Sequence, residues 1–559
     1  MCQNQSNHSN QNKQPGILWR LLIYYYEITK EFLRTTVLNG LKLFFLGCFL
    51  AASYNSLNFA INIVEKWQTS PVMTVMNPQT SFITKEPFPA ITICNMNQAQ
   101  YSKVKDFDLQ SLDYAMLQKL CFQELNYSSF LHTNPPPKDH SFSKFIVKNG
   151  QSCEHMVVYC EYGNSRRICT DLFREVLLDE GLCCSFNVVH PFMLYKGDYF
   201  MIRDYTSING QSIPLDWSPE KGYPSELPNS FYPRVSLGHG MTNGFTLILN
   251  GDIDNYYCSS TNGPGFKVSF HNPIDTPHVK ETGLSVALGY QTSFRITTLK
   301  EEAVEDLRTL AKPTERQCYF SDEYPLHYFR YYTRRNCEME CDAHFMLQEC
   351  NCIPYHMPKL WNNITVCSVT HFNCVVEADK DYVDASRLGC KRNCLASCND
   401  LSYFPKAFFT PLDNEGYAIR NPYFRNMSNE SLNNNFAMLK IFFPQNHYRG
   451  NVKNPYMGLT EFLSQTGGIM SLMMGFSIIS LVEMVYFFII KPLIYAWRKV
   501  FHKNTVDVME IRPNDDYELQ EYGNNNIKHH RYPVAPPNVF AKPQLPPYSR
   551  NFEHPNYVH

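Results

Sequence analysis

Two long apolar stretches lie near the ends of the chain, and short alternating apolar and polar runs fill the region between them. The first stretch is Leu41–Val64 and the second is Phe462–Ile490. Each is long enough to cross a hydrocarbon layer of about 30 Å as a helix. We therefore predict two transmembrane helices. A buried core helix is the alternative for the first stretch, because Lys42 and three asparagines interrupt it.

Basic residues flank both stretches on the side nearer the chain ends, among them Arg20, Lys30, Arg498 and Lys499. This distribution predicts that both termini are cytosolic and that the segment between the stretches is extracellular, as in a multi-pass plasma-membrane protein. The predicted organisation is a cytosolic segment (1–40), a first transmembrane helix (41–64), an extracellular cysteine-rich domain (65–461), a second transmembrane helix (462–490) and a cytosolic tail (491–559). The tail loses apolar periodicity, which is typical of disorder.

Within the region between the spans, alternating runs predict strands and fewer patterns predict helices. The predicted strands are Arg234–Leu237, Gly244–Asn250, Gly265–Phe270 and Ser293–Thr298. Helical spacing of apolar residues predicts helices over Asp171–Leu178, Glu301–Leu310 and Cys337–Gln348. We therefore expect an α+β extracellular domain attached to two membrane helices.

The cysteines are concentrated between the spans. Of the 20 cysteines, Cys2 and Cys48 stand alone and all others lie between Cys94 and Cys398. In an extracellular domain this density predicts disulfides. Zinc is the alternative for the pairs Cys337/Cys341 and Cys390/Cys394, because their spacing also suits a metal site. Four glycosylation sequons in the same region agree with an extracellular location: Asn126, Asn363, Asn426 and Asn429.

Charge and motifs narrow the class of function. Lys and Arg number 50 against 52 Asp and Glu, so nothing in the charge predicts nucleic-acid binding. We find no motif of an enzyme, a cofactor site or a metal site, and we expect a protein that is not an enzyme. A pair of spans in one chain cannot enclose water, so a channel would need several copies around an axis.

Glycines and small polar residues interrupt the second span. Gly467 and Gly468 precede Gly475-Phe476-Ser477, and Glu483 follows. Irregular backbone at membrane depth is tolerated where protein covers it or where it lines a water-filled path. One interpretation is a cation filter at Gly475–Ser477 with Glu483 as a deeper cation site. The other is that the small residues only permit close helix packing and that Glu483 is hydrogen-bonded inside a bundle.

Several motifs resemble the degenerin/epithelial sodium channel superfamily, which includes the acid-sensing and peptide-gated channels. They are Phe88-Pro-Ala-Ile-Thr-Ile-Cys-Asn95, Asp179-Glu-Gly-Leu-Cys-Cys-Ser-Phe-Asn187, Arg316-Gln-Cys-Tyr-Phe320, Cys350-Asn-Cys-Ile-Pro-Tyr355 and the stretch from Gly467 to Glu483. The resemblance implies a trimer whose extracellular domain has finger, thumb, palm and β-ball parts. It also implies sodium conduction, block by amiloride, a filter at Gly475, Phe476 and Ser477, and an inner cation site at Glu483.

The resemblance further implies seven disulfides: Cys94–Cys183, Cys160–Cys169, Cys318–Cys398, Cys337–Cys394, Cys341–Cys390, Cys350–Cys374 and Cys352–Cys367. Cys121, Cys153, Cys184 and Cys258 remain, and the sequence does not pair them. Phe476 is bulkier than the residues usual in the family filter, and the family's His-Gly motif before the first span is not evident.

We therefore predict a sodium-permeable channel subunit, in a homo- or heterotrimer of related subunits, gated through its extracellular domain by a ligand, protons or force. The alternatives are a non-conducting auxiliary subunit and a two-span receptor without a pore. Leu545-Pro-Pro-Tyr548 resembles a ligand of WW domains, and in the family such motifs recruit ubiquitin ligases.

Overall fold

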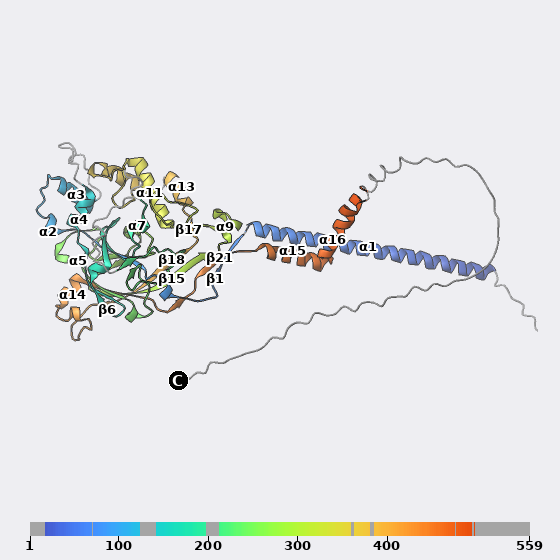
Figure 1. Cartoon of the computed structure of the whole chain (residues 1–559), viewed down its shortest axis with the longest axis horizontal. Coiled ribbons are helices and arrows are strands. Elements are labelled where there is room, and N and C mark those ends of the chain that lie inside the picture. Colours follow the sequence, from blue (N-terminus) through green and yellow to red (C-terminus); the bar gives the residue numbers. More distant parts are fainter. Residues whose placement is uncertain are drawn as a thin grey trace, which may run out of the picture. The chain divides into compact units, whose positions relative to one another are not determined.

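A computed structural model describes residues 17–69, 71–122, 141–196, 212–358, 363–380, 385–475, 477–494 and 497. The chain divides into two compact units, Met1–Ser477 and Ile478–His559. The first unit contains a β-rich body, which we define as the described residues from 71 to 457, together with the helices α1 (Ile17–Thr69) and α15 (Leu459–Met474) (Figure 1). The second contains the helix α16 (Ile478–Val485) and a short π-helix (Tyr486–Ile490).

An eight-stranded sheet is the scaffold of the β-rich body. Its strand order is β1-β21-β15-β19-β11-β5-β6, and β18 also pairs with β15. The 14-residue strand β15 runs antiparallel to β18 and parallel to both β19 and β21, so it joins the two ends of the sheet. The strands are β1 (Val72–Met76), β5 (Val157–Tyr162), β6 (Ser165–Arg167), β11 (Phe245–Asn250), β15 (Tyr290–Ala303), β18 (Asp400–Pro411), β19 (Phe436–Phe442) and β21 (Asn451–Pro455).

A second sheet has five strands in the order β14-β13-β3-β8-β7, all of them antiparallel to their neighbours. All six residues of the central strand β3 are buried, which explains its nearly continuous apolar sequence. The strands are β3 (Ala90–Asn95), β7 (Phe173–Leu178), β8 (Gly181–Phe186), β13 (Phe266–His271) and β14 (Leu284–Val286).

Four two-stranded pairs complete the sheets: β2–β20, β4–β12, β9–β10 and β16–β17. Their bounds are β2 (Ser81–Phe82), β4 (Asn97–Gln100), β9 (Ile213–Pro214), β10 (Phe231–Tyr232), β12 (Tyr256–Ser259), β16 (Cys318–Tyr319), β17 (Ala396–Ser397) and β20 (His447–Tyr448).

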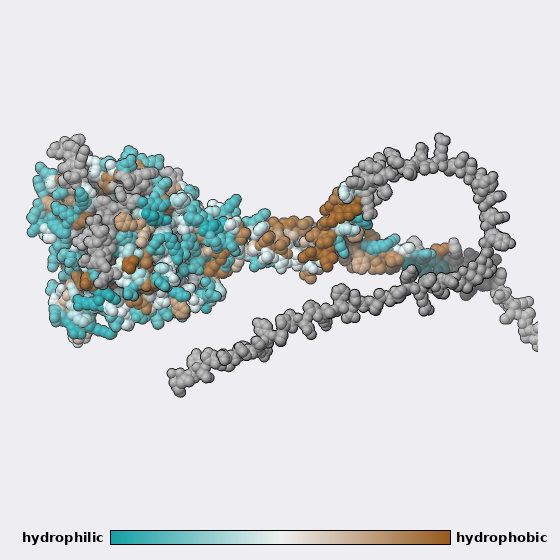
Figure 2. All heavy atoms as spheres, viewed as in Figure 1, coloured by the Kyte–Doolittle hydropathy of each residue, from teal (hydrophilic) through white to brown (hydrophobic). Residues whose placement is uncertain are grey.

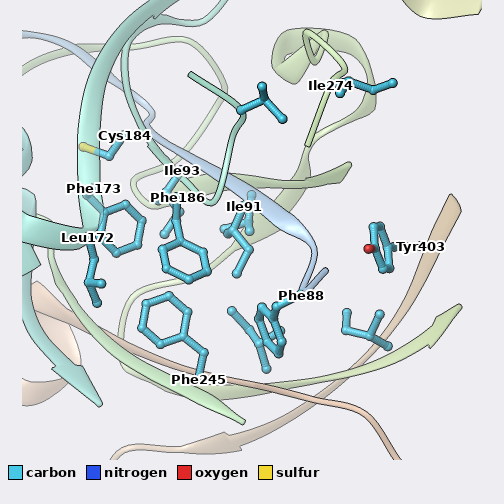
Figure 3. Close-up of a cluster of buried hydrophobic side chains, with 14 of the residues drawn as sticks. Phe88, Ile91, Ile93, Leu172, Phe173, Cys184, Phe186, Phe245, Ile274 and Tyr403 are labelled. Carbon is cyan, nitrogen blue, oxygen red and sulfur yellow. The ribbon is translucent and has the colours of Figure 1, made fainter. Parts of the chain in front are cut away.

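Aromatic side chains from strands of both sheets form the centre of the core (Figure 3). The rings of Phe186 and Phe245 lie 4.5 Å apart, and Phe88 packs edge-to-face against Tyr162 and Phe443 at 5.5 Å each. Such pairs stabilise a core beyond the effect of burial alone. The two sheets therefore share one core.

Helices surround the sheets. The longest in the body is α11 (Arg334–Cys350), which Thr333 caps through a hydrogen bond from the Asn336 N–H, and α12 (Phe372–Lys380) and α13 (Ala385–Asn393) follow it. The shorter helices are α2 (Tyr101–Val104), α3 (Leu112–Cys121), α4 (Phe142–Asn149), α5 (Cys153–Met156), α6 (Cys169–Leu172), α7 (Pro191–Leu194), α8 (Val279–Thr282), α9 (Leu307–Leu310), α10 (Pro313–Arg316) and α14 (Asn429–Asn435).

Nine disulfides join described cysteines, all of them in the β-rich body. Seven are the same pairs that the family resemblance implies. The other two are Cys121–Cys258 and Cys153–Cys184, which the sequence left open. Cys337 bonds to Cys394, and Cys341 bonds to Cys390 on α13, so these thiols are not available to zinc.

Three secondary-structure predictions need correction. Phe173–Leu178 is a strand and not a helix, because it forms a hairpin with β8 whose hydrogen bonds outweigh the helical spacing. Glu301–Ala303 continues β15 through pairing with β18 and β21, which leaves only Leu307–Leu310 helical. Arg234–Leu237 forms only an isolated bridge between Val235 and Pro87.

Candidate functional site: the membrane helices

The helix α1 runs without interruption over Ile17–Thr69, well beyond the predicted span 41–64 at both ends. Its part Tyr26–Thr69 is long and apolar enough to cross a membrane. Large apolar side chains such as Leu43 and Phe45 are about two-thirds exposed in the single chain. Figure 2 shows hydrophobic residues gathered on the membrane helices, whereas the β-rich body presents mainly hydrophilic ones. This exposure suits contact with lipid or with other helices.

The helix α15 (Leu459–Met474) begins just after β21. Glu461 accepts a hydrogen bond from the Gly458 N–H at 3.2 Å and so caps its first turn. One face of α15 packs against α1: the Ser53 hydroxyl lies 3.4 Å from the Met474 sulfur, and the rings of Trp67 and Phe462 lie 5.2 Å apart. Ser56 of α1 is buried as well.

The opposite face of α15 is small, polar and exposed. Ser464, Gly468, Ser471 and Gly475 recur at three- and four-residue intervals, so they lie on one side of the helix. The partly buried residues Phe462, Thr466, Ile469, Met470 and Met474 form the side toward α1. A Cβ added at Gly467 or Gly468 would meet no atom within 4 Å, so these glycines do not serve the packing of α15 against α1.

Gly475 ends α15. Its φ of +66° is left-handed, a conformation that glycine adopts without the steric cost of a Cβ atom. Its N–H still donates to Ser471 O at 2.9 Å. Ser477 is exposed and not helical, and Phe476 lies outside the described residues. The helical path of the second apolar stretch is therefore interrupted at the Gly475–Ser477 motif.

The second unit begins with α16 (Ile478–Val485) and continues as a π-helix over Tyr486–Ile490. Glu483 lies in α16 with its side chain exposed, and Lys491 lies 5.2 Å from the Phe487 ring centre. The second apolar stretch is long and apolar enough to cross a membrane only if Leu459–Met474 and Ile478–Ile494 are counted together as one broken span.

The base of the β-rich body connects directly to both helices of the first unit. The strand β1 follows α1, β21 precedes α15, and these two strands pair in antiparallel register from Val72↔Pro455 to Met76↔Asn451. The Tyr456 N–H donates to Pro71 O at 2.8 Å, and the Lys66 ammonium lies 4.8 Å from the Tyr456 ring centre. Sequence reasoning missed this junction, although Trp67 at the end of the first span is a signal typical of a membrane interface.

A partly buried ion-pair network lies next to the junction. The Lys300 ammonium is 3.0 Å from a Glu86 carboxylate oxygen and 2.8 Å from one of Glu302, and the Tyr448 hydroxyl donates to Glu86 at 2.8 Å. Burial alone would lower the pKa of Lys300, but the two carboxylates raise it above its usual value. The network ties β15 to the segment between β2 and β3.

The predicted glycosylation sites differ in accessibility. Asn363 and Asn426 are exposed, whereas Asn429 is half-buried with its Oδ1 atom covered. Asn126 and the Leu545–Tyr548 motif lie outside the described residues, as do 1–16 and 498–559 of the predicted cytosolic segments.

Comparison with known proteins identifies the family. The family model described as "Amiloride-sensitive sodium channel" matches residues 24–487. Pickpocket protein 28 of Drosophila melanogaster is 33% identical over 498 residues, which cover 85% of this chain and 79% of that protein. Acid-sensing ion channel 1A of Danio rerio is 22% identical, with 71% and 73% covered. Sodium channel protein Nach of Drosophila virilis is 25% identical, with 62% and 78% covered.

The matched residues contain the β-rich body with its disulfides, α15, α16 and all of α1 from residue 24 onward. They also include every motif on which the resemblance to the degenerin/epithelial sodium channel superfamily depends. The chain therefore belongs to the amiloride-sensitive sodium channel family, as a cation channel subunit.

Proposed function

We propose that this chain is a subunit of a trimeric plasma-membrane channel that conducts sodium, is blocked by amiloride and is gated through its extracellular domain. The observation that carries the proposal is the face of α15 formed by Ser464, Gly468, Ser471 and Gly475, which is turned away from α1. A small polar face on an otherwise apolar helix suits a water-filled axis between copies of the chain.

The proposed conducting path narrows at Gly475–Ser477. Backbone freed from helical hydrogen bonds at this motif would present carbonyl oxygens to a dehydrating cation, as in other ion filters. Glu483 would form a ring of carboxylates on the inner side, attracting cations and repelling anions. Phe476 contributes its backbone in this scheme.

The junction supports gating through the extracellular domain. Because β1 and β21 pair with each other and continue into α1 and α15, a movement of the large sheet would act on both helices together. The Lys300–Glu86 network lies on the same route from β15. The stimulus that we propose is an extracellular ligand such as a peptide, or protons, or force.

The experiment is expression of the chain alone in oocytes, with currents recorded during ligand application, pH steps and amiloride block. Single cysteines at positions 463 to 475 are introduced in a background with C48S and C2S, and a charged thiol reagent is applied from outside. Cysteines at Ser464, Gly468 and Ser471 should be modified with loss of current, whereas cysteines at Leu463 and Leu472, which lie off this face, should not be modified. S477A and E483Q should shift the reversal potential.

If the chain expressed alone carries no current, it is co-expressed with related subunits. Current that carries the S477A or E483Q signature then shows a conducting heteromeric subunit. If the co-expressed current never changes with these variants, and cysteines on the small polar face never react, the chain has no pore.

We also propose that both termini are cytosolic and that Leu545-Pro-Pro-Tyr548 binds a WW domain of a ubiquitin ligase. Substitution Y548A should raise the amount of the chain at the cell surface in a biotinylation assay. We further propose glycans at Asn126, Asn363, Asn426 and Asn429, tested by Asn→Gln substitutions and enzymatic removal of glycans.

A further inference from the structure

A cavity of about 110 Å³ lies inside the β-rich body, apart from the membrane helices. Its wall combines residues of β7 and β8 with the segments around Tyr232, Thr276 and His356. A cavity of this order can hold a molecule about the size of a benzene ring. Nothing in the proposed conduction mechanism uses it.

Arg234 brings a positive charge to this wall. Its guanidinium is half-buried, donates to the Ser212 hydroxyl at 3.2 Å and forms no ion pair with any described residue. The backbone of Arg234 is fixed, because the Asn187 amide bonds both to its N–H and to its carbonyl oxygen. A guanidinium has five N–H donors in a planar fork, so most of its hydrogen-bonding capacity is unused here.

The neighbouring Tyr232 carries an unsatisfied hydroxyl. The residue is 6% exposed, and the hydroxyl has no hydrogen-bond partner in the described part of the chain. The Arg174 guanidinium lies over its ring, 4.2 Å from the ring centre, and opposes the burial that raises the pKa of the hydroxyl. Leaving a buried polar group without a partner is unfavourable, and a ligand atom that bonds to the hydroxyl would remove this cost.

The surrounding charges leave this end of the cavity positive. Burial lowers the pKa of the Arg234 guanidinium, and the nearby charge of Arg167 lowers it further. Tyr162 and Asp171 raise this pKa. Asp171 is exposed at the rim. The buried Asp275 also lies in the wall, but it is not among the groups whose charge acts on Arg234.

Apolar side chains form the rest of the wall. Leu172, Phe186, Val189 and Leu194 all line it and are buried. Figure 3 shows Leu172 at the edge of the aromatic core and Phe186 within it, between Phe173 and Ile91. An inorganic anion would leave these surfaces unused, whereas an organic acid would contact both the positive end and the apolar wall.

We propose that this cavity binds a small organic carboxylate, held by the Arg234 guanidinium and the Tyr232 hydroxyl, with its apolar part against Leu172 and Phe186. Arginine pairs with a carboxylate through two parallel hydrogen bonds, which gives such a site its preference for a planar anion. The proposal is independent of ion conduction, so either can fail without the other.

The test uses the full-length chain in detergent micelles, with benzoate as the probe and benzamide as its neutral match. Ligand-observed NMR titration measures the two dissociation constants. Benzoate should bind, and benzamide should bind at least 10-fold more weakly. R234Q should weaken benzoate at least 10-fold, R234K less, and Y232F about 3-fold. R295Q, which changes an exposed arginine of β15, should have no effect.

The proposal is overturned if benzoate does not bind up to 10 mM, if benzamide binds equally well, or if R234Q folds and keeps the affinity for benzoate. Sulfate binding as tightly as benzoate would show a general anion site and would also contradict it. If R234Q does not fold, Y232F decides, because removal of the hydroxyl leaves the ring packing in place.

Discussion

The β-rich body and the membrane helices differ in where their apolar surface goes. In the body, residues such as Phe88 and Phe245 are almost fully buried, and nine disulfides join its described cysteines, some of them across more than 80 residues, as in Cys94–Cys183. In α15 and α16, Leu472 and Ile478 are each 83% exposed, and the free Cys48 on α1 is exposed as well. The body thus completes its core within one chain, whereas the helices need lipid and further helices to cover their surfaces.

The largest expected effect tests that difference directly. Phe88→Ala removes a ring that is 1% exposed and packs against Tyr162 and Phe443. It should lower the free energy of unfolding by about 3–5 kcal/mol, since it leaves a cavity in the core. Leu472→Ala on α15 is the control and should leave the stability of the body unchanged. Denaturation of the purified chain, followed by tyrosine fluorescence, measures both, and equal losses would refute the comparison.

A buried carboxyl makes the stability of the body depend on pH. Burial and then the nearby Asp400 raise the pKa of Asp275 from 3.8 to about 7. The folded state therefore holds more protons than the unfolded state between these values, and the free energy of unfolding falls as pH rises through them. D275N should remove this fall, which amounts to at most about 4 kcal/mol.

Asp216 provides the control of opposite sign. Burial would raise its pKa, but hydrogen bonds from Lys221 and Tyr331 lower it below the usual value. Its contribution is present above the unfolded pKa and is lost as pH falls, so D216N should flatten the acid side of the curve. Thermal melts from pH 3 to pH 8 compare the two variants, and an unchanged slope in D275N would contradict the prediction.

The helix α11 offers a third test inside the body. The buried Glu340 carboxylate accepts backbone hydrogen bonds from His327, Tyr328 and Phe329 at 2.7–3.1 Å. Glu340→Gln weakens these charge-assisted bonds and should destabilise the body by about 1–3 kcal/mol. On the same helix, Glu338 pairs only with Arg334 at the surface, and E338Q should change stability by less than about 0.5 kcal/mol. Equal stabilities of the two variants in urea denaturation would show that the three hydrogen bonds to Glu340 do not stabilise the body.

The smallest expected effect on folding lies in the membrane helices. Gly475→Ala places a Cβ at a φ of +66° and should cost about 1 kcal/mol. Because the cost falls on the helix break itself, the variant should alter ion selectivity more than surface abundance. G47A on α1 is the control, since its Cβ would meet nothing within 4 Å. Reversal potentials measure ion selectivity, and surface biotinylation measures surface abundance. Unchanged ion selectivity in G475A would contradict the proposed role of the helix break.

Sequence reasoning succeeded where a local pattern decides the structure. Gly244–Asn250 alternates apolar and polar residues and forms β11, and Cys337–Gln348 lies within α11. It failed over Phe173–Leu178, most of the helix predicted for Asp171–Leu178, where helical spacing and a strand in a buried hairpin suit the same residues. Pairing with β8 determined that this segment is a strand. A short apolar run does not reveal such a pairing partner.

The sequence by itself determined the two apolar stretches, their composition and the position of the helix break, because membrane length and the conformational freedom of glycine are local properties. Only the tertiary structure decided which cysteines complete the two remaining disulfides, which face of α15 turns from α1, and that Tyr232 and Arg234 share a cavity with Leu172. These features depend on contacts between residues far apart in the chain. Such contacts follow from close packing of the core, which no local pattern encodes.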